Sequence, residues 1–569
     1  MIAANRGPVE FVAGPDGERS QQRGSGGLVT ALSALAPHLP DSVWICAPRT
    51  EEDRAVALES PGGVLVETTT GGVEGSPGGT PAARATAKVP ETAKQRVRLL
   101  AVDADSFEKY YSVISNPILW FVQHNLWDLS NAPNITVVER AAFEEGYRAV
   151  NETFADAIVA EIDEHTGPST VMVHDYHLYL VGGMVRRARP DATLLHFVHI
   201  PWPQPDAWRV LPGWMRTEIM LGLVGNDLVA FQTERDAHNF LLACEELLQL
   251  PVDYSDSSVW VNGRTVAVRW YPISVDASQL ESFASSEVVS QYEQALENVR
   301  REHLIVRVDR TDLSKNILRG FLAYDRMLEK HPDLAGRVTF LAILQPSRQD
   351  VAEYAEYHER ILRLVADINL KHGNVEWQPI DLRMEDNLAQ AVAAYRLFDV
   401  LLVNSVYDGL NLVAKEGMLV NQRDGVLVLS EHAGVHDEIG AYSLSVHPLD
   451  IEQQADALYE GLFMPRSERR RRREGCVKII KRNGLAEWFT MQAKDILALR
   501  ESSDGSWAPL SFDLESVDQP PSRRSSRKRS TASDTPSEAA SSSKPPWSRR
   551  KAAKKSAMAS GWAEETAGA

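Results

Sequence analysis

Short apolar runs that alternate with helical patterns most constrain the fold of this chain of 569 residues. Continuous apolar runs of this kind indicate parallel strands that are covered on both faces by helices. The runs form two arrays, with a hinge expected near Tyr271–Ala277. They predict an α/β protein with two Rossmann-like, doubly wound domains that face each other across a cleft. The strand candidates are Thr170–His174, Thr193–Ile200, Asp227–Gln232, His303–Val308, Arg337–Leu344, Asp399–Asn404 and Gly425–Ser430.

These arrays divide the chain into segments. The N-terminal Rossmann-like domain is expected over residues 1–276 and the C-terminal one over 277–485, with a helix over 486–501 that crosses back to the first domain. Dense Gly and Pro residues predict a flexible insertion over 60–94. From Ser502 onward the chain is rich in Ser, Pro and Ala and poor in aliphatic residues, which predicts a disordered tail.

The net charge of −18 hides a division between the body and this tail. Eleven basic and two acidic residues lie between Arg523 and Lys555, which leaves about −27 for the rest of the chain. An acidic body argues against nucleic-acid or membrane-surface binding by the whole protein. The basic tail is expected to be solvated, with a nucleic-acid contact as the weaker alternative.

Three cysteines are too few for a disulfide framework and fit a reducing compartment. No apolar stretch approaches the length of a membrane span, and the N-terminus lacks a signal-peptide pattern. A cytoplasmic protein is therefore expected.

In doubly wound sheets, ligands bind beyond the carboxyl ends of the strands, and polar residues collect there in this chain. Arg6 follows the opening strand, Asp175 follows the run at 170–174, and His199 ends the next run. An Asp and a His at neighbouring strand ends can hold sugar hydroxyls. A metal site is the alternative, and the absence of familiar zinc-ligand spacing argues against it.

The second array carries two further polar clusters. Arg310 and Lys315 follow a strand, and two fixed cations there suit a pyrophosphate, although a solvated charge cluster is the alternative. Asp408 and Gly409 come where a strand ends and a helix begins, and Glu416 lies on that helix. Such a helix start offers free N–H groups, and Asp408 alone is also explained as a helix cap.

Together, and in this order, these residues resemble the trehalose-6-phosphate synthase family of retaining glycosyltransferases. The resemblance spans about Asn5 to Leu499. It is carried most strongly by His174-Asp175-Tyr176-His177, His199-Ile200-Pro201, Arg310-x-Asp312-x-x-Lys315 and the run from Asp408 to Glu416.

The resemblance implies a GT-B fold and transfer of glucose from UDP-glucose or GDP-glucose to glucose 6-phosphate, which gives trehalose 6-phosphate. The leaving phosphate would help to deprotonate the incoming hydroxyl, so neither a metal nor another cofactor is expected. The expected partners are small-molecule substrates, with a homo-oligomer left open and no membrane.

The resemblance also implies a role for each matching position. Arg310 and Lys315 would neutralise the donor pyrophosphate, and His199 would contact the transferring sugar. Asp175 and Trp120 would contact the acceptor sugar. The remaining positions implied for the donor are Gly27, Asp408, Gly409, Leu410, Asn411, Leu412 and Glu416, and those implied for the acceptor phosphate are Arg6 and Tyr111.

Two departures from the family pattern concern the acceptor. A second tryptophan that usually follows Trp44 is replaced by Ala47. The arginine that grips the acceptor phosphate is expected in the helix after Pro346-Ser347-Arg348, where this chain has His358. Glycerol 3-phosphate and an aminocyclitol phosphate are therefore alternative acceptors. A sugar-phosphate sensor without activity is the alternative from another class.

Overall fold

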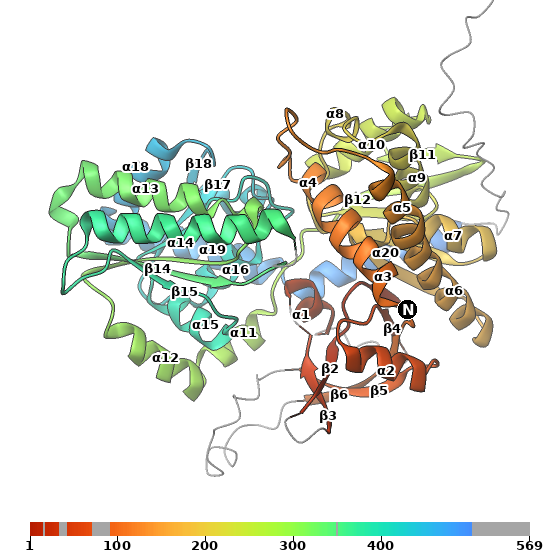
Figure 1. The fold of residues 1–569 in the computed structure, drawn as a ribbon, viewed down its shortest axis with the longest axis horizontal. Coiled ribbons are helices and arrows are strands. Elements are labelled where there is room, and N and C mark those ends of the chain that lie inside the picture. Colours follow the sequence, from red (N-terminus) through yellow and green to blue (C-terminus); the bar gives the residue numbers. More distant parts are fainter. Residues whose placement is uncertain (15–17, 25, 34–41, 71–90, 349–350, 503–569) are drawn as a thin grey trace, which may run out of the picture. The chain divides into compact units, whose positions relative to one another are not determined.

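Two large sheets organise the chain (Figure 1). The computed structural model describes residues 1–502 except for 15–17, 25, 34–41, 71–90 and 349–350. All described residues belong to one structural unit, Met1–Asp518. The tail expected from Ser502 lies outside the described residues, apart from Ser502 itself, which ends α20.

The first sheet has the strand order β10-β11-β12-β9-β8-β7-β1-β4-β6-β5. The run from β12 to β6 is parallel, and β5, β10 and β11 are antiparallel additions at the edges. Within it, β6-β4-β1-β7-β8-β9 follows the doubly wound 3-2-1-4-5-6 order, so the order reverses between β1 and β7. The strands are β1 (Ile2–Ala4), β4 (Val43–Cys46), β5 (Val64–Thr70), β6 (Glu91–Leu99), β7 (Thr170–His174), β8 (Thr193–Phe197), β9 (Leu228–Phe231), β10 (Val252–Asp253), β11 (Ser258–Val261) and β12 (Arg264–Trp270); a separate antiparallel pair is β2 (Val9–Ala13) and β3 (Arg19–Arg23).

The second sheet is parallel throughout and has the order β15-β14-β13-β16-β17-β18. This is again the 3-2-1-4-5-6 order, and it reverses between β13 and β16. The two sheets confirm the predicted α/β class with two Rossmann-like arrays. The strands are β13 (His303–Arg310), β14 (Val338–Gln345), β15 (Ile380–Arg383), β16 (Val400–Val403), β17 (Val426–Ser430) and β18 (Leu444–Val446).

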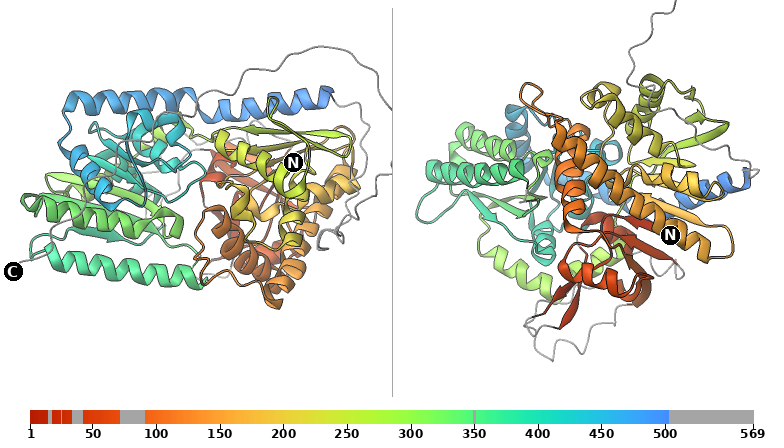
Figure 2. Two further views of the ribbon diagram at one scale, coloured as in Figure 1. Left: turned by 90° about the horizontal axis from the view of Figure 1, so that it is seen from above. Right: turned by 45° about the vertical axis from the view of Figure 1, so that its right-hand side comes forward.

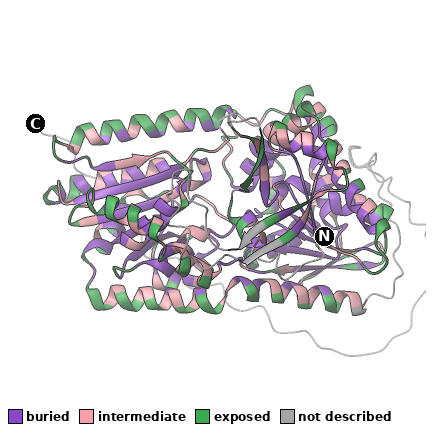
Figure 3. Ribbon diagram, turned by 90° about the horizontal axis from the view of Figure 1, so that it is seen from below, coloured by how far each residue is buried: buried purple, intermediate pink, exposed green. Residues whose placement is uncertain are grey.

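Helices cover both faces of each sheet because successive strand residues point to opposite sides. On β13, Ile305 packs into the core beneath α13, α14 and α18, whereas Leu304 and Val306 pack into the core on the other face. Figure 3 shows the strands as buried and the outer surfaces of the helices as exposed. The helices of the first array are α1 (Gly27–Ser33), α2 (Glu51–Glu59), α3 (Ala104–Glu108), α4 (Trp120–Gln123), α5 (Val137–Ala141), α6 (Ala149–Glu164), α7 (Val181–Ala188), α8 (Pro205–Trp208), α9 (Gly213–Leu223) and α10 (Glu234–Leu248), with π-helical segments Lys109–Leu119 and Ala142–Arg148.

The helices of the second array follow from the spacing of their apolar residues. In the longest of them, α14, the buried residues Tyr354, Tyr357, Ile361, Val365 and Ile368 recur every three or four positions and so form one apolar face. The helices are α11 (Ala277–Ala284), α12 (Glu287–Glu297), α13 (Ile317–Lys330), α14 (Ala352–His372), α15 (Leu388–Leu397), α16 (Leu412–Val420), α17 (His436–Ile439), α18 (Ile451–Phe463), α19 (Arg466–Arg482) and α20 (Leu485–Ser502).

Helices α19 and α20 connect the two arrays (Figure 2). Helix α19 packs against α16 of the second array, and α20 packs against β8 of the first sheet. The indole of Trp488 in α20 is buried and donates to the carbonyl of Tyr271, 3.0 Å away. The end of the described chain is therefore anchored on the N-terminal array.

The flexible insertion expected over 60–94 has regular structure at its described ends. Val64–Thr70 and Glu91–Leu99 are the strands β5 and β6, which pair antiparallel at the edge of the first sheet. The Val and Thr residues of the first segment favour an extended backbone, whereas the Gly and Pro residues collect mainly at 71–79. Residues 71–90 lie outside the described part. None of the described helices is both long enough and apolar enough to cross a membrane.

Candidate active site

Arg310 is the last residue of β13 and Lys315 follows this strand, and Asp408 lies beyond β16, where the strand order of the second sheet reverses. The Lys315 ammonium lies 2.5 Å from an oxygen of Asp408. The same oxygen accepts from the Asn411 amide at 3.0 Å and the Ser405 hydroxyl at 3.1 Å. Burial alone would raise the pKa of Asp408, but Lys315 outweighs it and the pKa is lowered. The sheet topology thus sets a fixed cation beside an ionised carboxylate.

The turn after Asp408 approaches the first array closely. A Cβ on Gly409 would lie 2.1 Å from the carbonyl oxygen of His199, so only glycine fits this position. Asn411 has a positive φ of 86° and caps α16 by accepting from the amide of Ala414 at 3.2 Å. A Cβ on Gly27, the first residue of α1, would meet Leu412 at 3.0 Å. Predicted donor residues from both arrays therefore meet here.

Leu410 and Glu416 complete the predicted donor set. The carbonyl of Leu410 accepts from the amide of Val435 at 2.9 Å, which ties this turn to the loop after β17. Glu416 is partly buried on α16, and its carboxylate faces the hydroxyl of Tyr395 at 3.4 Å. Burial raises the pKa of Glu416 to about 7. The carboxyl of Glu416 accepts hydrogen bonds when it is ionised. With this pKa it is readily protonated near neutral pH when no ligand is bound.

Asp175 and His199 follow the neighbouring strands β7 and β8, and an oxygen of Asp175 accepts from the His199 amide at 3.2 Å. Asp175 has a φ of 74°, and burial raises its pKa to about 6. Gln232 accepts from the Ile273 amide through Oε1, so its Nε2 donates to Nδ1 of His199, 2.9 Å away. The other His199 nitrogen then donates to Nδ1 of His174 at 3.1 Å. Both ring nitrogens of His199 are therefore bonded within the protein.

Trp120 and the loops after β13 and β14 meet around Asp312. The Trp120 indole donates to Oδ1 of Asp312 at 3.3 Å, and the Arg348 guanidinium pairs with Oδ2 at 2.8 Å. Arg348 also donates to the Tyr176 hydroxyl at 3.1 Å and lies 4.0 Å from the centre of the Trp120 ring. Arg310 lies 5.6 Å from the same ring. Asp312, which lies in the quoted motif but was assigned no role, thus links residues implied for the donor and for the acceptor.

Arg6 hydrogen-bonds the phenol of Tyr111, and the charges of two further arginines, Arg49 and Arg348, act on the same phenol. Burial would raise the pKa of the Tyr111 phenol, but Arg49, Arg348 and Arg6 outweigh it and lower the pKa to about 7. The guanidinium of Arg49 lies 4.6 Å from the centre of the Tyr111 ring. The sequence carried a signal for Arg348, because it ends the Pro346-Ser347-Arg348 run directly after β14, beside β13.

No described contact of His358 supports the acceptor-side position expected for it. His358 lies on α14, and among the described residues its Nδ1 is buried without a partner. No described contact joins it to Tyr111, Trp120 or Arg348. The loop after a parallel strand opens toward the ligand edge of the sheet, so Arg348 in that loop reaches the site, whereas His358 sits a further two turns along the helix.

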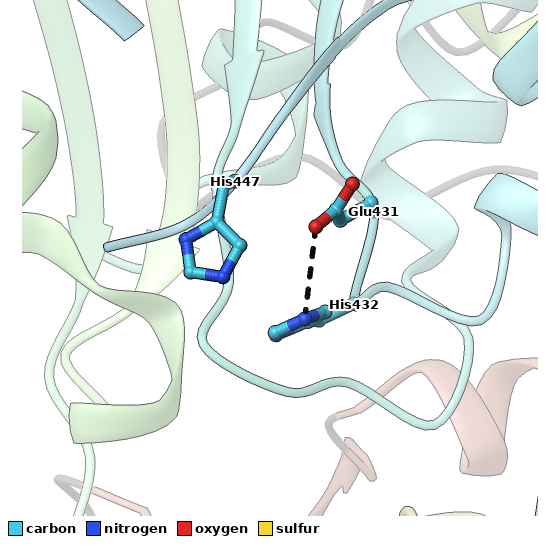
Figure 4. Close-up of side chains that lie close together, drawn as sticks. All are labelled: Glu431, His432 and His447. Atoms are coloured by element: carbon cyan, nitrogen blue, oxygen red, sulfur yellow. Dashed lines mark ion pairs between the residues drawn. The ribbon is translucent and has the colours of Figure 1, made fainter. Parts of the chain in front are cut away.

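Among the described residues, Glu431, His432 and His447 are a cluster that could hold a cation (Figure 4). They follow β17 and β18, whose register brings them together, and one ligand atom of each lies within 4.8 Å of the others. Nδ1 of His432 faces the carbonyl of Val406 at 3.0 Å, which leaves Nε2 toward Glu431. The amide of Leu449 donates to Nδ1 of His447 at 3.3 Å, so Nε2 of that ring carries its proton. A cation would have to displace that proton.

Comparisons with known proteins agree with this geometry. The model of Glycosyltransferase family 20 matches residues 1–498. A UDP-forming alpha,alpha-trehalose-phosphate synthase of Schizosaccharomyces pombe is 31% identical over 481 residues, which cover 82% of this chain and 84% of that protein. The UDP-forming synthase A of Dictyostelium discoideum is 28% identical over 521 residues, and the match covers 91% of this chain. The chain spans 65% of the length of that relative.

A solved structure is similar as well. The crystal structure of a UDP-forming alpha,alpha-trehalose-phosphate synthase from Burkholderia xenovorans, in complex with glucose-6-phosphate, superposes with a TM-score of 0.69 at 25% identity. The likeness covers 87% of this chain and 99% of that one. It confirms the predicted GT-B fold. The chain belongs to glycosyltransferase family 20, together with the trehalose-phosphate synthases.

Proposed function

We propose that this chain transfers glucose from UDP-glucose to glucose 6-phosphate with retention, and so makes trehalose 6-phosphate and UDP. One observation carries the proposal. Cations lie where the strand order of each sheet reverses, and the contacts of Asp312 with Trp120 and Arg348 link these two groups of cations. Arg310 and Lys315 suit a pyrophosphate, and Arg6 with Arg348 suits a sugar phosphate. Two anionic substrates that meet end to end fit this layout.

In the proposed reaction, the bond from C1 of the donor glucose to the β-phosphate oxygen breaks, and a bond from C1 to the acceptor hydroxyl oxygen forms. The acceptor proton passes to the departing phosphate oxygen. Arg310 and Lys315 stabilise the charge that grows on the leaving group. Asp408 holds donor hydroxyls, and Asp175 holds the acceptor sugar. These cations take the part that a metal plays in other transferases, so we propose that the chemistry needs none.

Family relatives support UDP as the nucleotide, because two of them are named as UDP-forming. The three cysteines are buried thiols without disulfides, which supports a cytoplasmic setting.

A matrix of donors and acceptors tests the proposal. The purified full chain is offered UDP-glucose or GDP-glucose with glucose 6-phosphate, glycerol 3-phosphate or an aminocyclitol phosphate. UDP release with glucose 6-phosphate, and an α,α-linked product by NMR, is the expected result. Turnover on another phosphate would reassign the acceptor. Donor binding without turnover on any acceptor would favour a sensor.

A further inference from the structure

Three arginines from three separate loops surround the phenol of Tyr111. Arg6 follows β1 and hydrogen-bonds the phenol, Arg49 follows β4, and Arg348 follows β14. Burial, together with the same three charges, holds the pKa of His177 well below its usual range. Asp312 balances the charge of Arg348 from one side, whereas no described carboxylate pairs with Arg49, and like charges gathered around one ring repel each other unless anions lie among them. The cluster therefore has the character of an anion site.

Arg49 is positioned for such a role by contacts that leave its guanidinium available. Its backbone amide donates to the buried carboxylate of Asp53 at 2.8 Å, and that carboxylate also accepts from the amides of Thr50 and Phe11. The guanidinium lies against the ring of Tyr111 at 4.6 Å and that of Phe107 at 5.6 Å. Across the described chain, no carboxylate lies within ion-pair distance of it.

A departure from the family pattern lies close to Arg49 in the sequence. Where family members usually carry a second tryptophan, this chain has Ala47, which is fully buried two residues before Arg49. Phe107 and Tyr111 stack on each other at 5.5 Å and form a surface for the planar guanidinium. This chain therefore has the cation Arg49 in the segment after β4, where family members usually have an aromatic residue.

We propose that Arg49 is a specificity-determining residue that adds a third cation to the acceptor's phosphate, beside Arg6 and Arg348. This inference rests on the proposed function and extends it to one further residue. A phosphate monoester carries nearly two negative charges at neutral pH and offers three acceptor oxygens, one for each guanidinium. The third cation selects a phosphorylated acceptor over a neutral or singly charged one.

The variant Arg49→Met tests the proposal, with Arg54→Met as its control. Arg54 lies on α2, five residues further along, and pairs with Glu51 at 2.7 Å, so the control removes the same charge from the same segment. Since hydrogen bonds to charged groups contribute about 1.5–3 kcal/mol, Arg49→Met should raise the KM for glucose 6-phosphate by about 10-fold to 100-fold. The KM for UDP-glucose and kcat should stay unchanged. Arg54→Met should match the wild type.

Calorimetry with inorganic phosphate separates this inference from the proposed function. Phosphate should bind the wild type and the control more tightly than Arg49→Met, whatever the turnover. If phosphate binding weakens as expected but glucose 6-phosphate is not used, the proposed function fails and the inference stands. Equal values for Arg49→Met and Arg54→Met would overturn the inference. A wild type that binds neither phosphate nor a sugar phosphate would overturn it as well.

Discussion

The ammonium of Lys315 lies 2.5 Å from the carboxylate of Asp408, and this contact joins the loop after β13 to the loop after β16. The two strands are neighbours at the point where the strand order reverses, so the pair follows from the sheet topology. Because Asp408 also accepts from Asn411 and Ser405, the pair is held before any substrate arrives. A cation that is already in place need not be ordered during the reaction.

Replacing Lys315 with methionine should lower kcat by two to three orders of magnitude. The loss of one preorganised group that stabilises a leaving charge typically costs about 2.7–4 kcal/mol. Stopped or continuous assays of UDP release measure the effect. The matched control is Lys330→Met, because Lys330 lies on the surface of α13 and pairs with Glu452 and Asp456.

Stability should change little in Lys315→Met, because Asp408 keeps its bonds from Asn411 and Ser405. Thermal unfolding of both variants checks this point. Wild-type kcat in a Lys315→Met protein with an unchanged Tm would remove Lys315 from the mechanism.

Arg348 rather than His358 is expected to control use of the sugar phosphate. The change Arg348→Lys keeps a charge beside Asp312 but loses the planar fork that reaches Asp312 and Tyr176 together. The KM for glucose 6-phosphate should rise by about tenfold, which corresponds to about 1.4 kcal/mol. The change His358→Ala should leave this KM unaltered, and steady-state kinetics with both variants decide between the two residues.

Stronger changes at Arg348 should also unfold the protein more easily. Arg348→Met removes the cation that pairs with the buried Asp312 carboxylate, which keeps only its hydrogen bonds from Trp120, Ser314 and Tyr354, and breaking a buried pair typically costs about 3–5 kcal/mol. The double variant Arg348→Met with Asp312→Asn should recover part of that loss. A larger KM effect from His358→Ala than from Arg348→Lys would contradict the assignment.

The sequence was sufficient for the α/β class with two Rossmann-like arrays and for the polar residues at the strand ends. Arg310, Asp175 and Asp408 could be placed at strand ends because βα alternation puts the carboxyl ends of parallel strands on one edge. Arg49 and Arg348 were missed because their role depends on how three loops converge, although the position of Arg348 directly after β14 was a signal that could have been used. Asp312 lay within the quoted motif, yet only the packing of Trp120 and Arg348 against it reveals its part.

Gln232 should matter through His199 although it was not predicted. Its Oε1 accepts from the Ile273 amide and its Nε2 donates to Nδ1 of His199. Gln232→Met removes both bonds and leaves buried polar groups unsatisfied, at about 1–3 kcal/mol each. Both Tm and kcat should fall, as measured by calorimetry and UDP release. The nearby exposed Glu234→Gln is the control, and an unchanged kcat in Gln232→Met would show that the position of the His199 ring is unimportant.

The raised pKa of Glu416 predicts how UDP affinity depends on pH. Burial raises this pKa to about 7, so much of the carboxyl is protonated at pH 6 in the ligand-free protein. Ribose hydroxyls donate to the ionised form, and binding therefore favours loss of the proton. The affinity for UDP should increase by about tenfold between pH 6 and pH 8, because one pKa unit corresponds to a factor of ten.

Glu416→Gln separates this effect from the titration of the terminal phosphate of UDP, which falls in the same range. The variant should bind UDP more weakly at pH 8 and should lose the part of the pH dependence that Glu416 contributes. Isothermal titration in two buffers of different ionisation enthalpy should show proton release on UDP binding to the wild type, and less with the variant. The contribution of Glu416 to the stability of the fold changes with pH in the opposite direction to its contribution to UDP affinity. A carboxyl with a raised pKa holds its proton more tightly when folded, so its contribution to stability declines as the pH rises from its ordinary value of 4.5 through about 7. Identical pH profiles of UDP affinity for wild type and Glu416→Gln would place this carboxyl away from the ribose.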